Sequence, residues 1–95
     1  MGNTKEFSPM ALTFEVAIKD YFTMRQTVKM LIWKVIMRDA RYRQNQLNEE
    51  LSYGEDLYSI DEVLNTIIKE YKQLEWYEAV QATIDCAEYY DIDLN

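Results

Sequence analysis

The stretch Thr23–Glu50, TMRQTVKMLIWKVIMRDARYRQNQLNEE, decides the fold because it predicts one long helix. No Gly or Pro lies between Pro9 and Gly54 to interrupt it. Its first four residues fit a capping box, in which a Thr hydroxyl and a Gln side chain satisfy free backbone amides at a helix start. Apolar residues then recur at three- and four-residue spacing. This spacing predicts a buried face made of Val28, Leu31, Ile32, Val35 and Ile36.

The length of this helix conflicts with the size of the chain. At 1.5 Å per residue, the helix would be roughly 40 Å long. A compact domain of 95 residues is only about 25–35 Å across. Residues 38–50 offer Ala40, Tyr42 and Leu47 among polar neighbours, so little of this half can be buried. We therefore expect the second half to project from the domain or to contact a partner.

Composition indicates a single helical domain, residues 1–95. Apolar residues make up 48% of the chain, as in folded proteins, and the chain has two Gly and one Pro. Turn-rich sandwiches and barrels are therefore disfavoured, and an all-α fold is predicted. No charged-then-apolar leader opens the chain, and no apolar run is long enough to span a membrane. With one cysteine, these features predict a cytoplasmic protein, in the host cytoplasm if a phage encodes it.

A first helix is predicted before the long helix, and a linker is predicted after it. Residues 1–7 are polar and expected to be loose, and Ser8-Pro9 then predicts a first helix that ends in a bend at Phe22–Thr23. After the long helix, a linker is predicted near residues 52–58, where Gly54 would close the helix in the left-handed conformation.

The C-terminal part predicts a helix hairpin. Ser59 and Glu62 form a capping box for a third helix, which has an apolar face and ends near Lys72. A three-residue connection leads to a fourth helix that begins at Trp76, and an acidic tail covers residues 89–95. The prediction is thus four helices, with this hairpin packed across the first half of the long helix.

The residue types that are absent argue against catalysis. Without His, the chain has no imidazole base or imidazole metal ligand, and one Cys cannot form a thiolate zinc site. Two Gly cannot form a phosphate-binding loop. We therefore predict no enzyme activity, no cofactor and no metal site, and we expect Cys86 to be a small, partly buried thiol.

Charge is divided unevenly along the chain, whose net charge is −7. Residues 23–47 carry a net charge of +5, and residues 48–95 carry −11. The two halves are expected to attract each other within one fold or across a dimer. Alternatively, the acidic part binds a basic protein, or a basic stripe made of Lys34, Arg38 and Arg41 follows a phosphate backbone.

Aromatic and acidic residues are the candidate partner-binding groups. Trp33 is predicted either to pack in the core or to be an exposed anchor at an interface. The other candidates lie on the long helix, on the fourth helix and in the acidic tail: Tyr42, Glu78, Asp85, Glu88, Tyr89, Tyr90, Asp91 and Asp93.

One segment resembles a known family. Residues 67–80, IIKEYKQLEWYEAV, show an apolar pair, an acidic residue, a short turn, and an aromatic residue followed by an acidic-Ala-Val triplet. The segment is similar to the core of the small late-transcription coactivators of T4-like phages. The resemblance covers about a quarter of the chain, which has some sixty residues before the match and lacks the family's long C-terminal extension with its apolar clamp-binding end. The resemblance implies a helix hairpin that docks on host RNA polymerase without catalysis. The matching residues are Ile67, Ile68, Glu70, Trp76 or Tyr77, Glu78, Ala79 and Val80.

The leading functional hypothesis is therefore a small acidic adaptor or inhibitor that binds another protein. It would act by occupying a surface of a basic or nucleic-acid-processing protein, with negative charge that mimics nucleic acid. The first alternative is a homo-oligomeric assembly protein, such as a homodimer, that pairs through the long helix. The second alternative is a nucleic-acid binder that uses the basic stripe.

Overall fold

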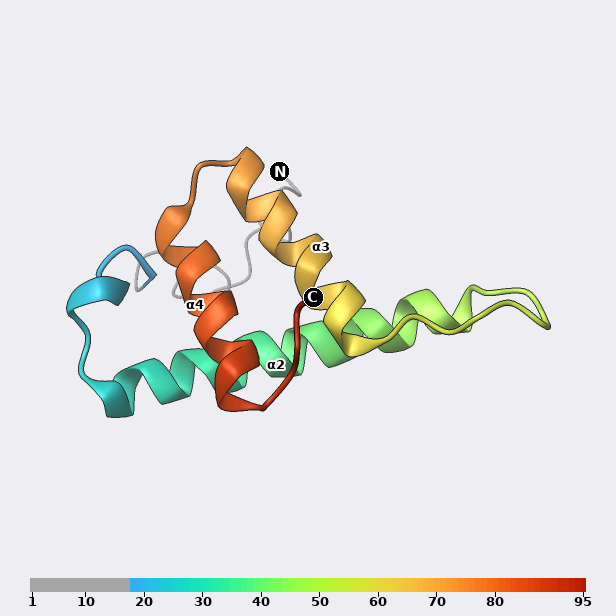
Figure 1. Cartoon of the computed structure of the whole chain (residues 1–95), viewed down its shortest axis with the longest axis horizontal. Coiled ribbons are helices and arrows are strands. Elements are labelled where there is room, and N and C mark those ends of the chain that lie inside the picture. The colour runs from blue at the N-terminus through green and yellow to red at the C-terminus, as the bar shows by residue number, and fades with distance from the viewer. Residues whose placement is uncertain (1–17) are drawn as a thin grey trace, which may run out of the picture.

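A computed structural model describes residues 18–95 of the chain. Regular structure in this part consists of the 3₁₀ turn η2 (Tyr21–Thr23) and the helices α2 (Gln26–Glu49), α3 (Ile60–Gln73) and α4 (Tyr77–Tyr89), without strands (Figure 1). The predicted all-α class is confirmed. Three α-helices are seen within residues 18–95, because most of the predicted first helix and the whole of the predicted loose N-terminus lie outside the described residues.

The long helix begins three residues later than predicted. Thr23 lies in η2, where its hydroxyl donates a hydrogen bond to the carbonyl of Asp20 at 3.0 Å. The capping-box prediction at Thr23 was therefore wrong: α2 starts at Gln26 after Arg25, which has an extended backbone and makes no side-chain cap. A Thr side chain can bond a preceding carbonyl as readily as a following amide, and here it stabilises the turn. The predicted bend at residues 22–23 falls within this turn.

The buried face of α2 is rotated about the helix axis, relative to the predicted face, by about the angle between successive residues. Ile32 and Ile36 are buried as predicted, together with Trp33, Met37 and Ala40. However, Val28 is 40% exposed and Leu31 is 60% exposed, so the prediction was wrong for these two. Each residue advances a helix by roughly 100°, and placing the large Trp33 ring inside moves Leu31 to the outside.

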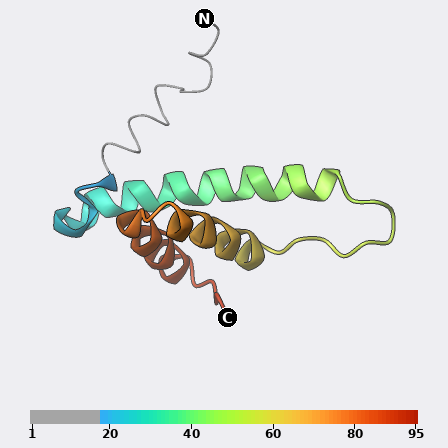
Figure 2. The same ribbon diagram turned by 90° about the horizontal axis from the view of Figure 1, so that it is seen from above.

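The helices α3 and α4 pack against each other and against the same side of α2 (Figure 2). Helix α4 is buried on two sides, by α2 and by α3. Small residues at these contacts let the three helix backbones approach closely. The fully or almost fully buried residues of α4 are Ala79, Ala82, Thr83, Cys86 and Ala87.

Helix α3 follows its sequence signals closely. The backbone amide of Ser59 donates to Glu62 Oε1 at 2.9 Å, which confirms the predicted capping box. The predicted apolar face is buried at Val63, Leu64, Ile67 and Ile68. Helix α3 ends at Gln73, and Trp76 precedes α4 as its N-cap residue.

Both C-terminal helices end in a left-handed residue that is not Gly. Glu75 has a φ of 62° and Asp91 a φ of 59°. After α3, the backbone amide of Trp76 donates to the carbonyl of Tyr71 at 3.0 Å. After α4, the backbone amide of Ile92 donates to the carbonyl of Ala87 at 2.8 Å. These are the bonds of the Schellman motif, so the sharp chain reversals do not depend on Gly here.

The second half of α2 and the linker form a tip beyond α3 (Figure 1). Asn48 Oδ1 accepts the backbone amide of Tyr58 at 2.7 Å, and Gln44 Nε2 donates to the carbonyl of Tyr58 at 3.0 Å. These bonds hold the returning linker against α2. Gly54 is left-handed as predicted, with a φ of 94°, but it lies in a turn closed by the Glu55 amide and the Ser52 carbonyl, and not at the helix end.

Candidate interaction surface

A chain of hydrogen bonds joins η2, α2 and α4 at one end of the core. Trp33 Nε1 donates to the hydroxyl of Tyr21 at 2.8 Å, and this hydroxyl donates to Asp85 Oδ2 at 2.6 Å. Gln81 Nε2 donates to the other carboxylate oxygen of Asp85 at 2.9 Å. Tyr21 is fully buried, and its pKa is raised above the ordinary value by burial and then by the bond to Asp85. The hydroxyl therefore stays protonated and fixes the position of the Asp85 carboxylate.

Cys86 belongs to the same junction. Its thiol, which is fully buried, donates a hydrogen bond to the backbone carbonyl of Trp33 at 3.3 Å. Burial raises the pKa of the Cys86 thiol to about 11. Because the thiolate is the reactive form, this thiol is a packing group between α4 and α2, more deeply buried than the sequence predicted.

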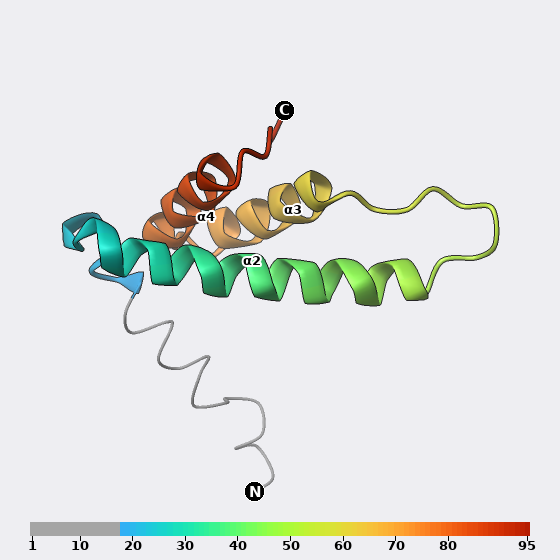
Figure 3. The ribbon, with the colours of Figure 1, turned by 90° about the horizontal axis from the view of Figure 1, so that it is seen from below.

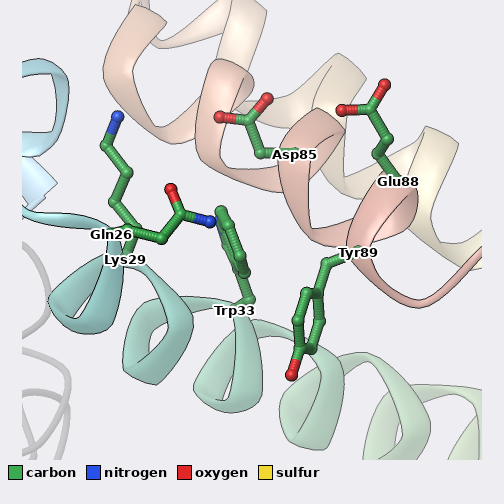
Figure 4. A pocket seen from close by; sticks show the side chains of 6 residues that line it. All are labelled: Gln26, Lys29, Trp33, Asp85, Glu88 and Tyr89. Atoms are coloured by element: carbon green, nitrogen blue, oxygen red, sulfur yellow. The ribbon is translucent and has the colours of Figure 1, made fainter.

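An open hollow of about 330 Å³ lies above this junction, between the first half of α2 and the second half of α4 (Figure 4). The rings of Trp33 and Tyr89 form its floor, with centroids 5.0 Å apart. Asp85 and Glu88 reach it from α4, and Gln26 and Lys29 reach it from α2. Lys29 Nζ lies 4.8 Å from the centroid of the Tyr21 ring, in the geometry of a cation–π contact.

A second hollow, of about 300 Å³, adjoins the first on the other side of α4. Glu88 lines both hollows. Apolar side chains and carboxylates alternate around the second hollow, which the tail residues border as they leave α4. Its lining residues are Ile84, Ala87, Glu88, Asp91, Ile92, Asp93 and Leu94. We call the two hollows together the α4 surface.

The structure brings most of the predicted partner-binding residues to this surface. Asp85, Glu88 and Tyr89 line the first hollow, and Asp91 and Asp93 line the second. Trp33 also lines the first hollow, but it is only 5% exposed. Of the two predicted alternatives, it therefore packs in the core and is not an exposed anchor.

Three other predicted residues lie elsewhere or inside. Tyr90 is half-buried and packs against the core, with its ring centroid 4.9 Å from that of Tyr89. Glu78 is half-buried in the first turn of α4. Tyr42 is 65% exposed and belongs to the outer face of α2, away from the α4 surface.

Attraction between the basic and acidic halves rests on one bidentate ion pair within residues 18–95. Arg43 donates to both carboxylate oxygens of Glu70 on α3, at 3.0 and 2.5 Å. The pair raises the pKa of Arg43 and lowers that of Glu70. Lys34 and Arg41 are exposed on α2, and Arg38 pairs with its neighbour Asp39 at 3.6 Å. Within residues 18–95, Lys34 and Arg41 therefore form no ion pair with the acidic half.

Sequence reasoning missed three residues of the site. No role is predicted from the sequence for Tyr21, whose hydroxyl is the centre of the hydrogen-bond chain. None is predicted either for Gln81, which orients Asp85, or for Lys29, which lines the first hollow. The partners of Tyr21 are distant in sequence, so no local pattern could indicate this role.

Among residues 18–95, no group of three or more Cys, Asp or Glu side chains is arranged to hold a metal ion. None of the helices described is both long enough and apolar enough to cross a membrane. Comparison of the chain with protein-family models, with curated proteins and with solved structures gave no match.

Proposed function

We propose that this protein is a non-catalytic binding protein whose α4 surface recognises a basic segment of another protein. The observation that carries the proposal is the set of four carboxylates, Asp85, Glu88, Asp91 and Asp93, around two adjoining hollows. Within the described residues, none of these carboxylates is paired with a Lys or Arg of the same chain. A partner that supplies those cations therefore gains attraction that folding has left unused.

The rest of the surface fits such a partner. Tyr89 is 45% exposed and Ile84 is 38% exposed, so apolar and aromatic contact area accompanies the negative charge. Lys and Arg side chains combine an apolar stem with a charged head, and both hollows offer matching walls. Asp85 is already oriented by Tyr21 and Gln81, so this part of the surface needs little rearrangement before binding.

Residues 67–80, which resemble the core of late-transcription coactivators, span the end of α3, the α3–α4 turn and the first turn of α4 with Glu78. The resemblance makes transcription proteins the first partners to seek. The four carboxylates would attract any basic partner, independently of this resemblance.

The test compares two charge-matched variants of the full chain. Glu88→Gln/Asp91→Asn/Asp93→Asn removes three charges from the α4 surface, and Glu49→Gln/Glu50→Gln/Asp56→Asn removes three exposed charges near the tip. The probe is a fluorescent Arg- and Leu-rich peptide in about 0.15 M salt. If each surface carboxylate contributes roughly 0.5 kcal/mol, the first variant binds about tenfold more weakly. The second should bind like the unmodified chain.

Capture of proteins from a bacterial lysate on the immobilised chain extends the test to natural partners. We expect a basic protein that is retained at low salt and lost by the α4-surface variant but kept by the tip variant. Equal loss in both variants, for the peptide and for the captured protein, would show that only overall charge acts, and the proposal would then be wrong.

A further inference from the structure

The outer face of α2 is a second surface, on the side of the helix turned away from α3 and α4 (Figure 3). Val28, Leu31, Val35 and Tyr42 follow each other at spacings of three, four and seven residues, so they form one ridge along this face. Leu31 is 60% exposed and Tyr42 is 65% exposed, which are high values for large apolar side chains in the middle of a helix. Val35 is half-buried, and the Tyr42 hydroxyl accepts a hydrogen bond from Gln46 Nε2, one turn further along α2, at 3.1 Å.

A basic edge runs beside the ridge. Lys34, Arg38 and Arg41 are all exposed and lie at i, i+4 and i+7, so they share one side of the helix with Leu31. Asp39 is the one acidic residue between Gln26 and Asn48, and it lies toward the other side of the ridge. An apolar ridge with a basic edge is the pattern of a helix that pairs with another amphipathic helix.

We propose that the outer face of α2 binds an acidic amphipathic helix of a partner protein. From Val28 to Tyr42 the ridge is roughly 21 Å long, which offers two heptads of contact to such a helix. Apolar side chains of the partner would pack on Leu31 and Val35, and its carboxylates would lie beside Lys34 and Arg41. The partner would differ in charge from the one that the α4 surface takes, so the protein can hold two partners on opposite sides.

Two other occupants fit the face less well. In a second copy of this chain paired through the same face, Lys34, Arg38 and Arg41 would lie near their own counterparts, and like charges would repel. A nucleic acid would meet the basic edge, but its phosphates cannot use the exposed Leu31 and Tyr42 side chains. The acidic helix alone uses both the ridge and the edge.

The experiment uses the full chain and three fluorescent probes in about 0.15 M salt. The first probe is a peptide of three heptads with Leu and Ile on one face and Glu elsewhere. The second has Lys in place of Glu, and the third is a DNA duplex of about 20 base pairs. We expect the acidic peptide to bind at this face. Tighter binding of the duplex than of the acidic peptide would overturn the proposal, as would no binding of the peptide.

Matched variants locate the binding site. Lys34→Glu/Arg41→Glu should weaken the acidic peptide at least tenfold, whereas Lys69→Glu/Lys72→Glu, with the same charge change on α3, should weaken it less than twofold. Leu31→Ser should weaken it several-fold, and Leu74→Ser, at a side chain that is 57% exposed, should not. All six substituted positions are exposed, so circular dichroism should show that the four variants are folded.

Light scattering on the same samples addresses the second copy. We expect a monomer at micromolar concentration for the unmodified chain and for Leu31→Ser. A dimer that Leu31→Ser dissociates would assign the face to self-association and overturn the proposal. Equal weakening of the peptide by both charge-reversal variants would overturn it too, because binding would then depend on overall charge alone. Neither result depends on whether the α4 surface binds its basic partner.

Discussion

Replacing Tyr21 with Phe removes one hydroxyl that joins three elements of the fold. This hydroxyl accepts the Trp33 indole N–H and donates to the Asp85 carboxylate, and the Tyr21 ring is fully buried. Phe keeps the ring and its apolar contacts. The indole N–H of Trp33, which is 5% exposed, then loses its hydrogen-bond acceptor in a buried place.

The magnitude follows from the two bonds. A buried donor left unsatisfied costs about 1–3 kcal/mol. The bond to Asp85 adds about 1 kcal/mol, because Asp85 is only partly buried and keeps its bond from Gln81. We therefore expect Tyr21→Phe to lower the free energy of unfolding by about 2–4 kcal/mol. For a domain of this size, that corresponds to a fall in Tm of roughly 10–25 °C.

Urea unfolding, followed by tryptophan fluorescence and by circular dichroism, measures this change. Tyr77→Phe is the control, because Tyr77 is 60% exposed. The free energy of unfolding of this variant should lie within about 0.5 kcal/mol of that of the unmodified chain. A double-mutant cycle of Tyr21→Phe with Asp85→Asn should give a coupling of about 1 kcal/mol. If Tyr21→Phe is as stable as Tyr77→Phe, the hydrogen-bond chain does not stabilise the fold.

Three further predictions concern other parts of the molecule. Glu75→Gly should raise the free energy of unfolding by roughly 1 kcal/mol in a urea titration, because Gly adopts the left-handed conformation at the end of α3 without strain; a decrease would contradict the Schellman assignment. The free energy of unfolding should fall as pH rises from about 9 to 11, because the Cys86 thiol ionises first in the unfolded chain while burial holds its pKa at about 11 in the folded chain. Cys86→Ala should lose less stability over this range, and an equal loss in both chains would show that Cys86 is not the cause. Asn48→Ala should speed hydrogen exchange of the Tyr58 amide at least tenfold and cost about 1 kcal/mol, and unchanged exchange would show that Asn48 does not hold the linker.

The elements that the sequence predicts correctly are those with short-range signals. The capping box at Ser59 and Glu62 and the apolar face after it are complete within one segment, and α3 matches both. At Thr23 the same reasoning failed, although the sequence pattern is also a capping box. The Thr23 hydroxyl had a competing acceptor three residues earlier, and nothing within the pattern itself indicates which bond wins.

The rotated face of α2 has a different cause, which also explains the two surfaces. Periodicity around Val28, Leu31 and Val35 shows that α2 has more apolar side chains than one buried face needs. Tertiary contacts determine which of them are buried. Tyr21 accepts the indole N–H of Trp33 and Cys86 donates to its backbone carbonyl, and these two bonds hold Trp33 inside. The side chains that these contacts leave outside form the ridge on α2.

The same hydrogen-bond chain links the two proposed surfaces. Asp85 on the α4 surface and Trp33 on α2 are both held by the Tyr21 hydroxyl, so this group fixes the Asp85 carboxylate and the buried position of Trp33 together. If Trp33 were released, α2 could turn to bury Leu31, and the ridge and the first hollow would be lost at once. A Tyr21→Phe chain that remains folded should therefore bind both the basic and the acidic peptide more weakly. Loss of only one of these activities would show that the two surfaces are set independently.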